Sequence, residues 1–272
     1  MLRPAAVSGS FYSGRADTLA KDIGKFLVRA GEPEAVPEAL GYVVPHAGYV
    51  YSGQTAAFAY RLLQKAPADR IVLLGPSHHS FIDGNSVFPE GEFETPLGRV
   101  AVDAPFASFL LKKKNMTGSP DSHFPEHCLE VQLPFLQVVL KKFTIVPILI
   151  GENSLDNLEQ LAKNLLEALE RFPGGRTVFL ASSDLSHYHS AAAADRMDNR
   201  LIELFNAFKI DELIAELNGN RIEACGAGAI VALMLLGSAL GRKNVRILDH
   251  SNSSRASGDS RRVVGYFSAV VY

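Results

Sequence analysis

Residues 41–64 read GYVVPHAGYVYSGQTAAFAYRLLQ. The first five residues, Gly41–Pro45, are apolar and contain two valines, a pattern that predicts a strand buried on both faces. Pro45 and Gly48 predict an abrupt turn, and the mostly apolar run Ser52–Gln64 predicts a helix against the sheet. A strand, a polar turn and a helix in this order predict one repeat unit of an α/β fold.

The same alternation of strand and helix continues along the chain. Further strands are predicted at Arg70–Leu74, Phe143–Ile150, Thr177–Ala181, Val245–Asp249 and Arg262–Val271, and further helices at Glu126–Lys141, Leu155–Arg171, Ala191–Phe208 and Cys225–Leu240. Residues Ser86–Val102, broken by prolines and glycines, predict a hairpin or two edge strands, while Gly31–Ala39 and Asn252–Arg262 predict loops. The sequence therefore predicts a single layered α/β domain over residues 1–272, with a central, mostly parallel or mixed sheet flanked by helices.

The composition excludes several classes of protein. Of the 272 residues 47% are hydrophobic, which is ordinary for a globular protein, and the net charge of -2 gives no attraction to nucleic acid or to an anionic membrane surface. No apolar run approaches the roughly 20 residues of a membrane span. The N-terminus has no apolar signal segment. With only two cysteines, the chain does not resemble a secreted disulfide protein, and we expect a cytoplasmic location.

Polar side chains follow three of the predicted strands. His46 follows the first strand, His78 and His79 follow the second, and Asp184 and His187 follow the strand TVFLA. Ligand sites of open α/β sheets lie beyond the carboxyl ends of the strands, so we expect these groups to converge there. Neighbouring residues on an extended chain point in opposite directions, so one histidine of the adjacent pair is expected to face the site.

Each of these residues also has a purely structural interpretation. His46 could end a strand at the turn set by Pro45 and Gly48, and Asp184 could cap a helix beside a solvated His187. Three polar strand ends in one chain favour a functional site over three separate coincidences.

Cys225 opens the predicted helix CGAGAIVALMLL. The positive end of a helix dipole favours a thiolate, and small residues after it allow a ligand to approach the backbone closely. A thiolate with two neutral imidazoles suits zinc, iron(II) or copper. A buried cysteine in a seam of small residues is the structural alternative, and the residues alone leave both interpretations open.

His127 and Glu130 lie three residues apart in the segment HCLE and so share one face of the predicted helix. They could hydrogen-bond to metal-binding histidines, as metal sites often require. A carboxylate near a helix N-terminus is also stable without any function. Tyr49, which follows Gly48, could form part of a pocket wall or could pack in the core.

Seven segments carry a family resemblance in their order along the chain: VPHAGYVYSG, LLGPSHH, ETPLG, EHCLEVQLPF, IVPILIG, SSDLSHY and ACG. Together they resemble the Memo family over nearly the whole chain. That family is itself similar in fold to the class III non-haem iron extradiol dioxygenases. Gln132 and the string SHY depart from animal members, which tend to have histidine and CHW there.

The resemblance implies that His46, His78 and Cys225 are metal ligands, with the cysteine in place of a dioxygenase glutamate. It implies that His187 is an acid–base residue, with Asp184 beside it. The residues expected around these groups are His79, His127, Glu130 and Tyr49.

These features predict a metal-dependent redox protein, an oxygenase-like oxidoreductase that uses iron or copper on an unidentified substrate. A zinc hydrolase is one alternative, because two histidines, a cysteine and a water suit tetrahedral zinc. A binding or signalling module that holds a peptide or partner in the same pocket is another. The expected ligand is a small molecule or peptide. The resemblance also implies a functional association with a radical SAM protein.

Overall fold

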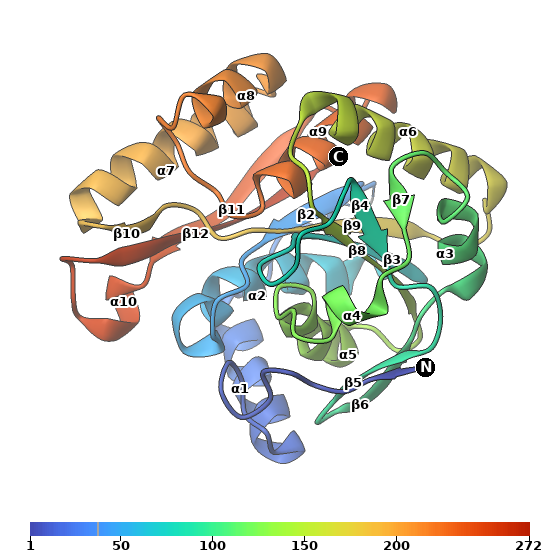
Figure 1. Cartoon of the computed structure of the whole chain (residues 1–272). Helices are drawn as coiled ribbons and strands as arrows, with labels where there is room; N and C mark the ends of the chain where they lie inside the picture. The colour runs from blue at the N-terminus through green and yellow to red at the C-terminus, as the bar shows by residue number, and fades with distance from the viewer. Residues whose placement is uncertain (37) are drawn as a thin grey trace.

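A mixed β-sheet runs through the computed structural model, which describes residues 1–36 and 38–272 (Figure 1). Its centre is formed by four parallel strands in the order β2 (Gly41–Val44), β9 (Thr177–Ser182), β3 (Arg70–Pro76) and β8 (Thr144–Ile150). These strands are almost entirely buried, because helices cover both faces. This explains why the sequence reads as continuous apolar runs.

Antiparallel strands extend the sheet on both sides of the parallel centre. On one side β12 (Val263–Val271) pairs with β2, and β10 (His187–His189) and β11 (Val245–Asn252) pair with β12. On the other side β4 (Asn85–Val87) pairs with β8, and β7 (Met116–Thr117) follows β4. A separate small sheet contains β1 (Leu2–Arg3), β5 (Glu92–Thr95) and β6 (Gly98–Ala101). The predicted mixed α/β architecture is confirmed.

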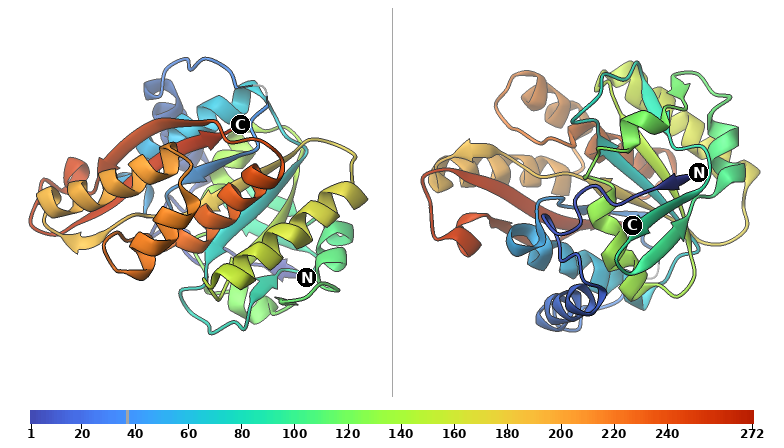
Figure 2. Two further views of the ribbon diagram at one scale, coloured as in Figure 1. Left: turned by 90° about the horizontal axis from the view of Figure 1, so that it is seen from above. Right: turned by 60° about the horizontal axis from the view of Figure 1, so that its bottom comes forward.

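Helices lie on both faces of the sheet (Figures 1 and 2). One face carries α1 (Ala16–Arg29), α2 (Tyr49–Lys65) and α5 (Leu133–Val139), and the other carries α3 (Ala104–Leu110), α6 (Leu155–Arg171) and α9 (Ala227–Ala239). Beside β11 and β12 lies α7 (Ala191–Asn206), which contacts α8 (Ile210–Asn218). Short helical turns are α4 (Pro120–His123), η1 (Glu130–Gln132) and α10 (Ser254–Ser257).

The helix predicted over Glu126–Lys141 is wrong in its first part. Residues 126–127 are irregular, residues 128–129 form a turn, and the regular helix α5 begins only at Leu133. Pro134 lacks an N–H and its ring crowds the carbonyl four residues earlier, so an α-helix does not run through it unbroken. The early segment is instead held by the side chain of Glu126, which accepts hydrogen bonds from the backbone N–H of His127 and Cys128.

Other predicted boundaries need smaller corrections. The segment Ser86–Val102 forms the predicted hairpin with β5 and β6, but its first residues lie in β4 of the main sheet. The short helix α10 interrupts the loop predicted at Asn252–Arg262. The loop predicted at Gly31–Ala39 is irregular where it is described, and Pro37 lies outside the described residues. Across residues 1–36 and 38–272, no helix has both the length and the apolar character needed to cross a membrane.

Candidate metal centre

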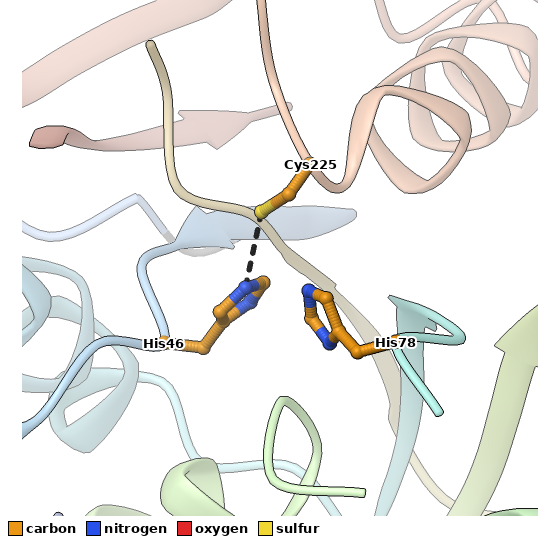
Figure 3. A group of neighbouring side chains, drawn as sticks. All are labelled: His46, His78 and Cys225. Atoms are coloured by element: carbon orange, nitrogen blue, oxygen red, sulfur yellow. Dashed lines mark hydrogen bonds between the residues drawn. The ribbon is translucent and has the colours of Figure 1, made fainter. Parts of the chain in front are cut away.

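Three side chains converge at the edge of the sheet where the parallel strands end. His46 lies two residues after β2, His78 lies two residues after β3, and Cys225 lies just before α9. The Sγ atom of Cys225 is 3.1 Å from Nε2 of His46, and one ligand atom from each of the three residues lies within 4.8 Å of the others (Figure 3). Metal–ligand bonds of about 2.0–2.3 Å bring ligand atoms to similar separations. The three donors therefore fit a single metal ion.

The side chain of His46 is fixed by Ser182 at the end of β9. His46 Nδ1 is 2.9 Å from Ser182 Oγ, which donates its one proton to the carbonyl of Cys128 at 2.7 Å. Ser182 Oγ also accepts a hydrogen bond from Gln132 Nε2 at 2.9 Å. Because the hydroxyl has no second proton, Nδ1 of His46 must be the donor. Nε2 therefore keeps its lone pair and faces Cys225 and His78.

The side chain of His78 is fixed by Glu126 in the same way. Nδ1 of His78 lies 2.9 Å from Glu126 Oε1, and the backbone N–H of His78 donates to Oε2 at 2.7 Å. Glu126 is only 2% exposed. Its burial raises the pKa, but the hydrogen bonds from His78 outweigh this and hold the pKa of the carboxyl well below its usual range. A carboxylate that orients a histidine toward an ion is a common feature of metal sites.

The position of Cys225 depends on contacts with the loop after β9. The backbone N–H of Asp184 donates to Sγ at 3.2 Å, and the N–H of Cys225 donates to the Asp184 carbonyl at 3.3 Å. At Gly226, a Cβ atom would lie only 2.2 Å from the Ser182 carbonyl oxygen and 2.7 Å from the Ser183 side chain. Only glycine lets the Cys225 turn approach β9 this closely.

The predicted thiolate at a helix N-terminus needs a correction. The helix α9 begins at Ala227, so Cys225 precedes it. Burial, and then the nearby charge of Asp184, raise the pKa of the Cys225 thiol well above its usual range. The helix dipole therefore does not by itself produce a thiolate here. A bound cation would favour loss of the proton.

Asp184 supports His46 rather than His187. Its Oδ1 atom accepts a hydrogen bond from the backbone N–H of His46 at 2.7 Å. Burial raises the pKa of the Asp184 carboxyl to about 7, against the opposing effect of hydrogen bonds from the backbone of His46 and Ala47. In the described part of the chain, no hydrogen bond joins Asp184 to His187. Asp184 was expected to lie beside His187, but its carboxylate hydrogen-bonds to the backbone of the candidate ligand His46 instead.

His187, the first residue of β10, lies on the wall of a pocket of about 750 Å³ that also includes His46, His78 and Cys225. Its backbone N–H donates to Glu223 at 3.3 Å. Burial lowers the pKa of its imidazole, so the ring is neutral at neutral pH. We call this pocket the front pocket. Its lining also contains the aromatic residues Phe11, Tyr51, Tyr188 and Tyr266, and Arg262 lies over the ring of Tyr188.

His127 lies next to the predicted ligands. Its ring stacks on that of His78 with centroids 4.7 Å apart, and its Nδ1 is 3.2 Å from Glu126 Oε1. Burial lowers the pKa of His127 to about 4. Nitrogen atoms of His78 and His127 and an oxygen of Glu126 form a second group that could hold a metal ion. Because this group shares His78 with the first, we treat the two as one centre.

Three other predicted neighbours are placed differently. Glu130 is fully buried and accepts hydrogen bonds from Arg3, from Tyr12, and from the backbone N–H of residues 6 and 7. Glu130 thus anchors the N-terminal segment. The prediction that it hydrogen-bonds to a metal-binding histidine is wrong.

Tyr49 donates to the carbonyl of Val131 at 2.6 Å and packs on Phe135, so it is a core residue. His79 is exposed, with its ring centroid 6.3 Å from that of His127.

Sequence patterns missed the residues that orient the ligands. Glu126 acts on a histidine 48 residues away, and Ser182 acts on one 136 residues away. No spacing rule connects such pairs. The only available signal was that Glu126 directly precedes the segment HCLE and that Ser182 is the first residue of the segment SSDLSHY.

Comparison with known proteins agrees with this description. A family model described as Memo-like protein matches residues 3–270. A MEMO1 family protein from Thermoplasma acidophilum is 35% identical and aligns with 99% of this chain and 98% of its own length. One from Thermotoga maritima is 36% identical over the full length of both chains. An uncharacterised Escherichia coli K12 protein of known structure shares the fold, with a TM-score of 0.52, 10% identity, and coverage of 85% of this chain and 100% of its own.

Proposed function

We propose, on the premise that this chain belongs to the Memo-like protein family, that it is a metal-dependent redox protein whose centre is His46, His78 and Cys225. The observation that carries the proposal is the convergence of the three donor atoms within 4.8 Å of one another. Both imidazole rings are also oriented, because their Nδ1 atoms hydrogen-bond to Ser182 and Glu126. A bound iron or copper ion would supply a redox centre with open positions for a small molecule. The similarity of the family to non-haem iron dioxygenases supports an oxygenase-like reaction.

Each neighbouring residue has a task that follows from its contacts. Ser182 and Glu126 hold the Nδ1 protons of the two histidines, so that both Nε2 atoms remain free to bind. Asp184 fixes the backbone of His46. His187 is neutral and lies on the pocket wall beside Cys225. It accepts a proton from a hydroxyl group of the substrate and returns a proton to the product.

The proposal is tested by metal analysis of protein purified without oxygen. The wild type is expected to contain about one iron or copper per chain, and Cys225→Ala to lose most of it. The matched control is Cys128→Ala, because Cys128 is the other cysteine, is buried, and donates its thiol to the Pro76 carbonyl rather than to the site. Equal metal content in the wild type and Cys225→Ala would exclude Cys225 as a ligand. Stoichiometric zinc, with turnover indifferent to oxygen, would favour a hydrolase instead.

A further inference from the structure

A second pocket, here called the back pocket, also includes Cys225 and His187 in its lining. It has a volume of about 390 Å³ and is bounded by residues of α6, α8 and α9. Cys225 and His187 belong to the walls of both this back pocket and the front pocket described above. The two pockets therefore adjoin at the predicted metal ligand and the predicted acid–base residue.

The back pocket differs from the front pocket in chemistry. Its lining contains six large aliphatic residues, Leu155, Leu158, Ile214, Leu217, Ile222 and Val231, and also three asparagines, Asn153, Asn218 and Asn220. Among the described residues its lining has no lysine or arginine, and its carboxylate, Glu223, is paired with His189 at 3.0 Å. Aliphatic walls of this kind favour uncharged groups, because each buried apolar surface gains free energy from leaving water.

The helix α8 contributes aliphatic side chains to the wall of the back pocket. Ile210, Leu213, Ile214 and Leu217 follow a helical spacing that places them on one face. Leu213 is fully buried, whereas Ile214 and Leu217 are only partly buried and line the pocket. Ile214 and Leu217 thus pack against the hydrophobic core and also line the back pocket.

The size of the pocket indicates what kind of group fits. A volume of about 390 Å³ lies within the range of pockets that bind small molecules. This is far more than a diatomic gas requires and is suited to a short hydrocarbon chain or a ring.

We propose that the back pocket binds the hydrocarbon part of the substrate, whose polar part lies in the front pocket at the metal centre. This rests on the proposed function, because it assigns the substrate to the same site. The substrate is thus an amphipathic small molecule, polar at one end and apolar at the other. Its apolar end passes Cys225 and His187 toward α8.

The test uses straight-chain primary alcohols from ethanol to hexanol as probes of the metal-free protein. Binding is measured by nuclear magnetic resonance titration. In the wild type, each added CH₂ is expected to tighten binding by up to about four-fold. Ile214→Trp fills the pocket and is expected to abolish this increase in affinity with chain length. Ala215→Trp is the matched control, because Ala215 is the next residue of α8, is exposed, and does not line the pocket. Ala215→Trp should keep the full increase in affinity with chain length.

A second readout connects the pocket to the site. Cobalt-loaded wild type is expected to show a thiolate-to-cobalt absorption band, and hexanol should shift it while leaving the band of Ile214→Trp unchanged. If alcohol affinity does not increase with chain length in the wild type, or increases equally in Ile214→Trp, the back-pocket proposal is overturned. The proposal of a metal centre is not affected by that result. A gain that depends on Ile214 without any cobalt–thiolate band would uphold the pocket and refute the metal centre.

Discussion

Glu126 offers a sharp test of how the ligands are oriented. Its carboxylate accepts hydrogen bonds from four N–H groups, namely Nδ1 and the backbone N–H of His78 and the backbone N–H of His127 and Cys128. In Glu126→Gln one oxygen becomes an NH₂ group that faces a donor, so His78 loses the acceptor either of its Nδ1 proton or of its backbone N–H, and its ring is held less firmly. Loss of such an orienting partner typically costs 10–100-fold in metal affinity, or about 1.4–2.8 kcal/mol.

The chain provides a matched control for this substitution in Glu130. Both carboxylates are buried, at 2% and 0% exposure, and lie four residues apart. Glu130 binds the N-terminal segment and not a histidine, so Glu130→Gln should lower the free energy of unfolding without changing metal affinity. The assays are chelator competition for affinity and urea unfolding for stability. Equal metal affinity in the two variants would refute the assignment of Glu126 to His78.

Two further substitutions test the packing and the charge of the site. Gly226→Ala places a Cβ 2.2 Å from the Ser182 carbonyl, so we expect loss of about 1–3 kcal/mol in urea unfolding together with weaker metal binding. At Gly24 in α1 an added Cβ would have no heavy atom within 4 Å, so Gly24→Ala should instead stabilise the helix by about 0.5–1 kcal/mol. Equal changes in unfolding free energy in the two glycine variants would contradict this reasoning. Asp184 has its pKa raised from 3.8 to about 7 in the folded chain, so its contribution to stability is fully present below pH 3.8 and is lost as the pH rises through 7. In metal-free protein we therefore expect the wild type to lose several kcal/mol of unfolding free energy relative to Asp184→Asn over this interval, at about 1.4 kcal/mol per pKa unit. An unchanged pH profile in that variant would refute the buried, protonated carboxyl.

The sequence allowed the sheet and the convergence of two candidate ligands to be predicted for one physical reason. Parallel strands end at a common edge, so the apolar runs before His46 and His78 were enough to bring these histidines together. Cys225 does not follow a strand, and only the family resemblance distinguished it from a packing cysteine. The orienting residues Glu126 and Ser182 were missed because their bonds join segments distant in sequence.

Local patterns also misplaced some side chains. Glu130 and His127 share a helical spacing, but the chain is not an α-helix at residues 126–129, and Glu130 pairs with Arg3 instead of facing the site. The resemblance placed Asp184 beside His187, whereas its carboxylate accepts a hydrogen bond from the backbone N–H of His46. The cytoplasmic location, the single domain and the association with a radical SAM protein stay predictions.

The central claim is that His46, His78 and Cys225 bind one metal ion together, and X-ray absorption at the metal edge tests it most directly. Protein purified without oxygen should show one sulfur at about 2.3 Å and imidazole nitrogens at about 2.0–2.1 Å. The sulfur contribution should vanish in Cys225→Ala and remain in Cys128→Ala. A shell of nitrogen and oxygen alone in the wild type, or protein that binds no metal, would contradict the account.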